Sequence, residues 1–230
     1  MKNFDWGDYL DQSDSHKEWF RNTIQREFFD TEKNIYERFF EVEENDIVMD
    51  VGASIGPFSY LLKDKNISYL YCIEPSKVQL SPLVNNISSM PFTVIPYAIG
   101  DSDLIKIDLG FYGENIITEV KAMSFKEIIK KYNINKIDFL KTDCEGGEYN
   151  IFSIENICWL KENMKKCAGE WHLDTTESKQ KFREFRDVFL RVFPKYRIYS
   201  TLDGVDISWD VWNEHFINYY TEVIIYIDNR

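Results

Sequence analysis

The chain has 230 residues, 27 of them basic and 39 acidic, which gives a formal net charge of −12 at neutral pH. An acidic surface of this kind repels phosphate backbones and anionic lipid, and no apolar run approaches the roughly 20 residues of a membrane span. We therefore expect one cytoplasmic domain over residues 1–230, with a large, aromatic-rich core and with neither nucleic acid nor membrane as a partner.

Helical and strand-like segments alternate along the chain. Apolar residues near helical spacing predict one or two amphipathic helices between about residues 16 and 41, within an N-terminal helical segment of about 1–45. Short apolar runs predict strands, and helical patterns lie between most of them. The predicted strands are 47–51, 69–73, 92–98, 137–142, 166–171, 196–201 and 219–228. The predicted helices that follow the N-terminal segment are 57–63, 77–87, 124–132, 149–164 and 178–192.

Repeated strand–helix units imply a parallel sheet with right-handed crossovers and helices on both faces. Ligands of such a sheet bind beyond the carboxyl ends of its strands. The two closing strands come after five such repeats and add an antiparallel member. The predicted fold is therefore α/β and Rossmann-like, with a seven-stranded, mostly parallel sheet that contains one antiparallel strand.

Residues 46–58 are the most informative stretch, because they combine a buried strand, a glycine turn and the start of a helix. Such a turn lets a ligand lie against backbone groups at a helix N-terminus. An acid, Glu74, ends the next predicted strand, and a carboxylate at this distance suits the two hydroxyl donors of a ribose. An ordinary turn of a parallel sheet is the alternative explanation.

The glycine spacing distinguishes two cofactors. A dinucleotide site requires G-x-G-x-x-G, because the pyrophosphate needs close backbone approach and the helix needs a third small residue. Here only Gly52 and Gly56 are present, and Pro57 and Phe58 follow them. The turn therefore favours S-adenosyl-L-methionine over NAD.

Polar residues also follow the later strands. Residues 98–101, A-I-G-D, come after the third strand, where Asp101 could accept from an adenine amino group and Ile99 could contact the ring. A turn-forming aspartate is an equal alternative for Asp101. Residues 143–148, D-C-E-G-G-E, come after the fourth strand, and carboxylates this close repel one another unless water, a cation or developing positive charge is nearby. Glu148 is also explained as an acid in the first turn of a helix.

The fifth predicted strand ends at Gly169-Glu170-Trp171-His172, which places Glu170 and His172 on the same edge as Asp143. One of these groups could act as a base, and His172 is favoured for that role by its ordinary pKa near 6.5. Alternatively, several of them could hold a cation, and oxygen ligands with one imidazole suit Mg²⁺ or Mn²⁺ more than zinc. A buried salt-bridge network is the third explanation.

Three blocks of the chain resemble the FkbM-type methyltransferases of the class I S-adenosylmethionine-dependent superfamily. The resemblance covers most of residues 26–172. Residues 46–56 read D-I-V-M-D-V-G-A-S-I-G, residues 72–75 read C-I-E-P, and residues 137–148 read I-D-F-L-K-T-D-C-E-G-G-E. The third block is the specific one. Ser54 departs from the family pattern, which has Asn at that position.

The resemblance implies a class I methyltransferase fold and O-methylation of a hydroxyl on a sugar, a glycan or a small secondary metabolite. A non-catalytic S-adenosylmethionine-binding module is the main alternative, and an NAD-dependent oxidoreductase is disfavoured by the missing glycine. The predicted catalytic residues are Asp143, Glu145, Glu170 and His172, of which Asp143, Glu170 and His172 are also the metal candidates. The predicted cofactor-binding residues are Asp50, Gly52, Ala53, Ser54, Gly56, Glu74, Pro75, Ala98, Ile99, Asp101 and Asp143.

Overall fold

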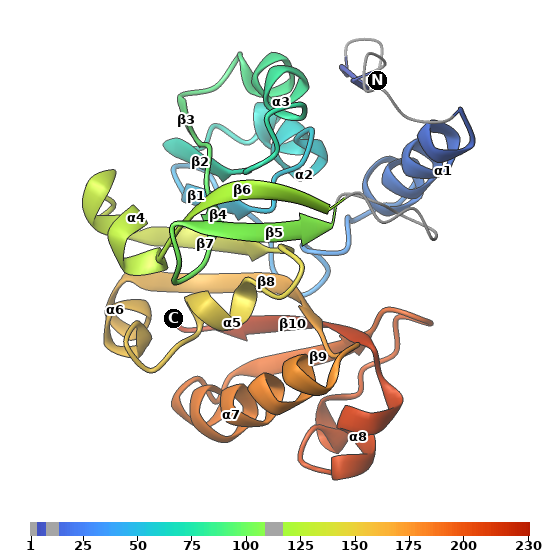
Figure 1. Ribbon diagram of the computed structural model, residues 1–230, viewed down its shortest axis with the longest axis vertical. Helices are drawn as coiled ribbons and strands as arrows, with labels where there is room; N and C mark the ends of the chain where they lie inside the picture. The colour runs from blue at the N-terminus through green and yellow to red at the C-terminus, as the bar shows by residue number, and fades with distance from the viewer. Residues whose placement is uncertain (1–3, 8–13, 109–116) are drawn as a thin grey trace.

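A central sheet of seven strands organises the computed structural model, which describes residues 4–7, 14–108 and 117–230 (Figure 1). The strand order across the sheet is β3-β2-β1-β7-β8-β10-β9. These strands are β1 Ile47–Val51, β2 Tyr69–Ile73, β3 Phe92–Ile95, β7 Ile137–Thr142, β8 Met164–His172, β9 Tyr196–Ser200 and β10 Glu222–Asp228.

All pairings from β3 to β8 are parallel, whereas β10 runs antiparallel to both of its neighbours. The last strand of the chain is thus inserted between β8 and β9. This order and the single reversed strand confirm the predicted Rossmann-like, class I methyltransferase fold. Because β1, β2, β7 and β8 are parallel, their carboxyl ends meet at one edge of the sheet.

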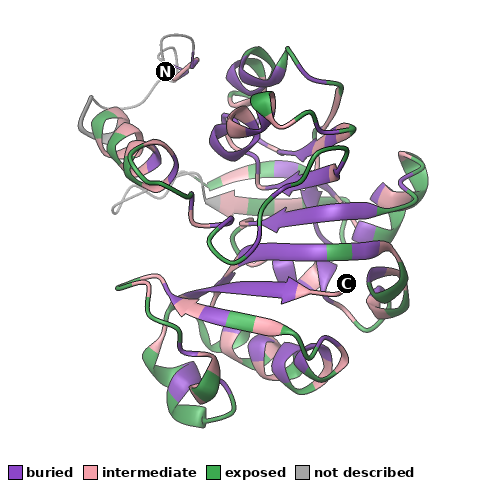
Figure 2. Cartoon of the chain, turned by 180° about the vertical axis from the view of Figure 1, so that it is seen from behind, coloured by how far each residue is buried: buried purple, intermediate pink, exposed green. Residues whose placement is uncertain are grey.

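Helices cover both faces of the sheet, as predicted (Figure 1). One face packs against α4 to α8, and the aromatic core there includes Trp171 of β8 and Phe185 of α7. The other face packs against η1, α2 and α3, with Phe58 and Phe139 stacked between helix and strand. Figure 2 shows the resulting burial of the central strands. The helices are α1 Asp14–Ile24, η1 Gln25–Phe29, α2 Pro57–Leu61, η2 Leu62–Asp64, α3 Leu80–Ile87, α4 Phe125–Lys131, α5 Glu148–Ile151, α6 Ile157–Asn163, α7 Thr176–Val192, η3 Ser208–Asp210 and α8 Glu214–Tyr219.

A second, smaller sheet was not predicted. Its strands, in the order β4-β6-β5, are β4 Ala98–Ile99, β6 Ile117–Met123 and β5 Leu104–Asp108. β4 pairs with β6 in parallel, and β5 pairs with β6 antiparallel. The predicted strand 92–98 is thus divided between the two sheets. In β6, buried Val120 and Ala122 alternate with exposed Glu119 and Lys121, as in a strand with one buried face.

The N-terminal segment is less helical than predicted. Helical structure in its described part is confined to α1 and the π-helical turn η1, and residues 30–46 contain no helix. Side chains there bind the backbone instead: the Asn34 Oδ1 accepts from the N–H of Tyr36 at 3.0 Å, and the Glu37 Oε1 accepts from the N–H of Val42 at 2.8 Å. Such local bonds compete with the helical ladder. The rest of the predicted 1–45 segment, residues 1–3 and 8–13, lies outside the described residues.

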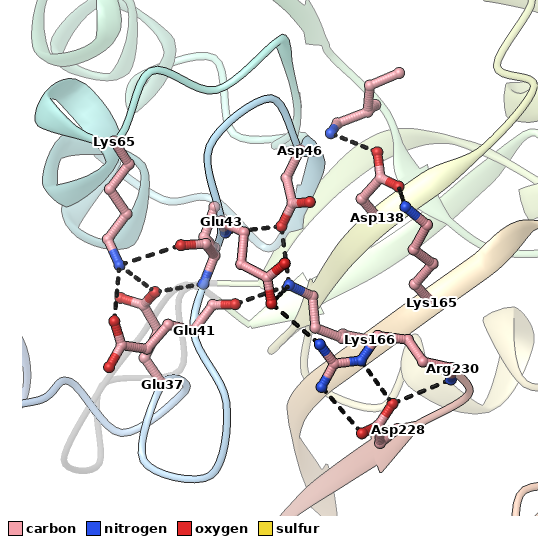
Figure 3. A network of polar contacts seen from close by, with 12 residues as sticks. Glu37, Glu41, Glu43, Asp46, Lys65, Asp138, Lys165, Lys166, Asp228 and Arg230 are labelled. Carbon is pink, nitrogen blue, oxygen red and sulfur yellow. Dashed lines mark hydrogen bonds and ion pairs between the residues drawn. The ribbon is translucent and has the colours of Figure 1, made fainter.

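A network of ion pairs closes the opposite edge of the sheet, where β1, β7 and β8 begin (Figure 3). The buried ammonium of Lys166 lies 3.0 Å from Asp46 and donates to the carbonyl of Glu41 at 2.9 Å. Lys165 lies 2.6 Å from Asp138. The acids at this edge are paired with basic side chains, so their contacts stabilise the fold. A ligand site is therefore expected at the other edge, where the parallel strands end.

We predict that Gly169→Ala destabilises the fold by about 3 kcal/mol, measured by urea unfolding. Gly169 of β8 pairs with Thr142 of β7, and an added Cβ would lie 2.0 Å from the Thr142 hydroxyl oxygen. Gly100→Ala is the control, because its nearest neighbour would be a side-chain methyl of Ile105 at 3.3 Å. An equal loss of stability in both variants would contradict the packing argument.

Candidate functional site

The turn after β1 is held against both neighbouring strands. The N–H groups of Gly52 and Ala53 both donate to the carbonyl of Ile73 at the end of β2, at 3.0 and 3.1 Å. Gly52 has a φ of +71°, and a Cβ at this position would lie 1.7 Å from the backbone oxygen of Asp143. Glycine is therefore required here by the β7 backbone as well as by the left-handed conformation.

Glu74 lies next to this turn, at the end of β2. Its side chain accepts from the backbone N–H of Ser54 at 2.8 Å and from that of Ser76 at 2.7 Å. Burial raises the pKa of Glu74 to about 7, although the two N–H donors oppose that effect. Each carboxylate oxygen keeps a free lone pair, so Glu74 can still accept from two hydroxyl groups of a ligand.

A cavity of about 630 Å³ opens at the carboxyl ends of β1, β2, β7 and β8. One wall is formed by the β1 turn and Glu74, and a second by Ile105 and Ile107 of the small sheet. A third wall comes from α1 and η1, including Trp19 and Glu27, and the fourth from the loop before α5 and the start of α7. This volume is within the range of small-molecule and cofactor sites.

Most of the predicted cofactor-binding residues line this cavity. They are Gly52, Ser54, Glu74, Pro75, Ala98, Ile99 and Asp143. Four others do not line it. Asp50 is fully buried and accepts from the Ser59 hydroxyl at 2.6 Å, and Ala53 is buried behind the turn. Gly56 directly precedes α2 and lies close to the side chain of Leu83 in α3. Asp101 lies in an exposed bend. The position of Asp101 fits the alternative reading of a turn-forming aspartate.

Asp143 follows β7 and faces both the cofactor wall and the N-terminal segment. Its Oδ2 accepts from the hydroxyl of Tyr36 at 2.8 Å and lies 3.9 Å from the ammonium of Lys141. The side chain remains one-third exposed. Asp143 is therefore fixed in direction but still accessible to a ligand.

His172 ends β8 and is held by buried partners. Its Nδ1 lies 3.2 Å from the Oε1 of Glu148, which also accepts from the His172 backbone N–H at 3.0 Å. Tyr149 donates to the His172 carbonyl at 2.7 Å. The Nε2 faces the other way, 3.6 Å from Glu170 and 3.4 Å from Glu145. All four predicted catalytic residues thus lie at one edge, where Asp143, Glu145 and His172 line the cavity and Glu170 does not.

These contacts reverse the predicted ranking of bases. Burial alone would lower the pKa of His172, but the bond to Glu148 and the charges of Glu148, Glu145 and Glu170 raise it to about 11. His172 is therefore protonated at neutral pH and is not a base in this state. Burial and the nearby charge of Asp143 raise the pKa of Glu170 well above its ordinary value, so Glu170 has the higher proton affinity of a buried acid.

Asp143, Glu170 and His172 also have the geometry of a metal-binding group. One ligand atom from each residue lies within 4.8 Å of the other two. Cis ligands of an octahedral ion with bonds of about 2.1 Å are about 3 Å apart, so small side-chain movements would suffice. The Nδ1 contact with Glu148 leaves Nε2 directed at the carboxylates, which is the arrangement of a metal-binding histidine with a carboxylate behind it. These residues therefore fit a Mg²⁺ or Mn²⁺ ion.

Several residues of the site were not predicted to have a role. Glu27, Trp19 and Tyr36 come from the N-terminal segment, whose sequence carries no motif that points to this edge. Lys141 and Glu148 lie inside the I-D-F-L-K-T-D-C-E-G-G-E block, and a lysine inside the predicted buried strand 137–142 was the available signal for Lys141.

The comparisons agree with the predicted resemblance. Residues 93–196 match the sequence profile described as the Methyltransferase FkbM domain, which confirms the FkbM-type resemblance over that part of the chain. The hexuronic acid methyltransferase AglP of Haloferax volcanii is 27% identical over 123 residues, which are 48% of this chain and 50% of AglP. The chain thus spans about half the length of this curated relative.

Solved structures with a similar arrangement are methyltransferases of low sequence identity. An rRNA methylase from Streptococcus thermophilus is 9% identical, with 95% of this chain and 98% of that one covered and a TM-score of 0.48. A TehB-like S-adenosylmethionine-dependent methyltransferase from Corynebacterium glutamicum is 10% identical, with 95% of this chain and 100% of that one covered and a TM-score of 0.46.

Among the helices that the structure describes, none combines the length and the apolar character that a membrane span requires.

We predict that the affinity for S-adenosylhomocysteine falls as the pH drops below 7. Glu74 is protonated in that range, and a protonated carboxyl is a poorer acceptor for two ribose hydroxyls. The dissociation constant, measured by calorimetric titration, should rise below pH 7 by no more than roughly tenfold per pH unit and level off at the value for the protonated form. Glu74→Gln should bind more weakly and without this pH dependence. The same slope in both proteins would show that another group titrates.

We predict that the imidazole of His172 stays protonated above pH 9, measured by NMR titration of the chain's three histidines. Its folded pKa lies above its unfolded value of about 6.5, so the contribution of the protonated form to stability is complete below that pH. It is lost as the pH rises towards 11. Glu148→Gln removes the main carboxylate partner and should lower the pKa of His172. An unchanged pKa in that variant would contradict this assignment of the shift.

Proposed function

We propose that this protein transfers a methyl group from S-adenosyl-L-methionine to a hydroxyl group of a saccharide or of a small metabolite. The observation that carries the proposal is one continuous cavity, in which Glu74 and the β1 turn form one wall and the Asp143–His172 edge forms another. A methyltransferase needs this arrangement, because the acceptor oxygen must lie in line with the methyl–sulfur bond.

The cofactor half of the cavity has chemically suitable groups for S-adenosyl-L-methionine. Glu74 offers carboxylate oxygens to the ribose, and Ile99 offers an apolar surface to the adenine. Gly52 and Ser54 of the β1 turn line the same part of the cavity. The same walls lack a third glycine for a pyrophosphate, which disfavours the NAD-dependent alternative.

The acceptor half must help to remove a proton from a weakly acidic hydroxyl. We propose that Asp143, Glu170 and His172 hold a Mg²⁺ or Mn²⁺ ion for this purpose. When bound, such an ion lowers the pKa of a hydroxyl and orients its oxygen. The hydroxyl of Tyr36 holds the Asp143 carboxylate in place, and Glu148 holds the imidazole of His172 with Nε2 towards the carboxylates. The exposed carboxylate of Glu145 is available to accept hydrogen bonds from hydroxyl groups of the acceptor. His172 would bind the ion through Nε2 after this nitrogen has lost its proton.

A metal-free reaction is the second candidate for acceptor activation, and the environment of Glu170 favours it. The raised pKa of this buried carboxylate makes it a stronger base than an exposed one. In this mechanism Glu170 accepts the hydroxyl proton while His172 remains a cation held by Glu148. A module that binds the cofactor without transferring its methyl group is the alternative function.

The acceptor is proposed to be a saccharide for two reasons. The partly matching relative AglP acts on a hexuronic acid, according to its description. In addition, the acceptor half combines the aromatic side chain of Trp19 with the carboxylates of Glu27 and Glu145, which can contact the apolar face and the hydroxyl groups of a sugar ring.

We predict methyl transfer from S-adenosyl-L-methionine to hydroxyl groups in a panel of glycosides and uronic acids, measured by S-adenosylhomocysteine release. If the ion is required, EDTA should abolish turnover and Mg²⁺ or Mn²⁺ should restore it. Asp143→Asn and Glu170→Gln should each lower turnover by roughly 100-fold or more. Glu177→Gln, which changes an exposed acid at the rim of the cavity, is the control.

The outcomes separate the alternatives. Turnover that is indifferent to EDTA but lost in Glu170→Gln supports the metal-free base. Cofactor binding without transfer to any acceptor supports the non-catalytic module. Full activity in both the Asp143→Asn and Glu170→Gln variants contradicts the assignment of this edge as the acceptor side.

A further inference from the structure

We propose that Lys141 is a positioning residue, which fixes the cofactor turn and the Asp143 carboxylate relative to each other. This inference rests on the proposed function and adds a residue to which the motif analysis gave no role. Lys141 lies on β7, only 4% of its side chain is exposed, and it reaches the wall of the cavity. A lysine is almost never buried in this way unless its charge is paired.

The ammonium of Lys141 uses its hydrogen-bonding capacity on the end of β1. It donates to the carbonyl of Gly52 at 2.7 Å and to that of Val51 at 3.3 Å, and it lies 3.2 Å from the Oδ1 of Asp50. Its hydrogen bonds thus go to two backbone carbonyls of the β1 end, and its contact with Asp50 is an ion pair. Because both hydrogen bonds hold backbone carbonyls, we infer that Lys141 acts on the cavity through that backbone.

The backbone held by Lys141 is the cofactor turn. The N–H of Gly52 is already bound to the Ile73 carbonyl of β2, so the Gly52 peptide is held by β2 on one side and by Lys141 of β7 on the other. Two residues further on, Ser54 has a φ of 51° and donates its N–H to Glu74. The position of the Gly52 carbonyl thus determines how the turn meets the carboxylate proposed to bind the ribose.

The same ammonium also acts on the acceptor side. Asp143 lies two residues after Lys141 on the chain, and its Oδ2 is 3.9 Å from the Lys141 Nζ. Tyr36 donates to this oxygen, and its ring lies 5.3 Å from the ammonium. One buried cation is therefore placed between the cofactor turn and the carboxylate that faces the reacting groups.

A second buried lysine offers a matched comparison. Lys166 of β8 is also almost completely buried and pairs with a buried aspartate, Asp46, but it lies at the opposite edge of the sheet (Figure 3). Both pairs remove charge from water in the same fold. If Lys141 only stabilises the sheet, replacing either pair should affect ligand binding equally. If Lys141 positions the site, replacing the Asp50–Lys141 pair should weaken binding more than replacing the Asp46–Lys166 pair.

The test replaces each pair by neutral residues of similar size. Asp50→Asn with Lys141→Met should raise the dissociation constant of S-adenosylhomocysteine at least tenfold, measured by calorimetry, and should lower kcat on the acceptor. Asp46→Asn with Lys166→Met should lower the thermal stability by a similar amount. The dissociation constant of this second double variant should nevertheless stay within threefold of that of the natural protein. Lys141→Arg, which keeps the charge, should recover part of the lost affinity and provides a milder variant if the neutral pair does not fold.

Three results would overturn the inference: unchanged affinity and kcat in the Asp50–Lys141 double variant, an equal loss of affinity in the Asp46–Lys166 double variant, or no recovery with Lys141→Arg. Failure of the natural protein to bind S-adenosylhomocysteine contradicts the proposed function and this inference with it. Normal binding by the natural protein and by the Asp50–Lys141 variant contradicts the inference alone.

Discussion

The close approach of β1 and β7 at their carboxyl ends is the constraint on which the site depends. The backbone of Gly52 touches the backbone oxygen of Asp143 so closely that no side chain fits between them. This contact places the cofactor turn and the acidic loop beside each other, although they are about 90 residues apart in the chain. Parallel pairing alone brings strand ends to one edge, but the glycine determines how near the two loops come.

Charge is distributed unequally between the two edges of the sheet. At the edge where the parallel strands begin, acids and bases alternate and satisfy one another around Lys166. At the edge where they end, carboxylates that follow β7 and β8 converge beside the cavity, and the acidic side chains that line it outnumber the basic ones. Structural networks tend towards neutrality, so an excess of one sign beside a cavity indicates a ligand or reacting group of the opposite sign.

The parts of the fold that could be predicted are those in which local pattern and tertiary structure agree. The short apolar runs of β1, β2 and β7 are buried on both faces, and the predicted bounds of all three strands agree with the structure. Residues 30–41 were predicted as helix from apolar spacing, but Asn34 and Glu37 bind the nearby backbone, and periodicity does not report such bonds. The small sheet was missed because its strands pair at a distance across an exposed surface.

The candidate site divides in the same way. Glu74 and Asp143 were predictable because each directly follows a strand, and strand ends share an edge. Tyr36 could not be predicted, since its hydroxyl reaches Asp143 from 107 residues away without any motif. The protonation of His172 could not be predicted either. It depends on the buried carboxylate of Glu148, whose alternative reading as a first-turn helix acid was correct but incomplete.

The most direct test of the account is a crystal structure with S-adenosylhomocysteine bound. We expect the ribose hydroxyls to lie within hydrogen-bonding distance of Glu74 and the sulfur to face the edge formed by Asp143, Glu170 and His172. A ribose bound away from Glu74, or a sulfur directed away from that edge, would contradict the central claim that this single cavity brings cofactor and acceptor together.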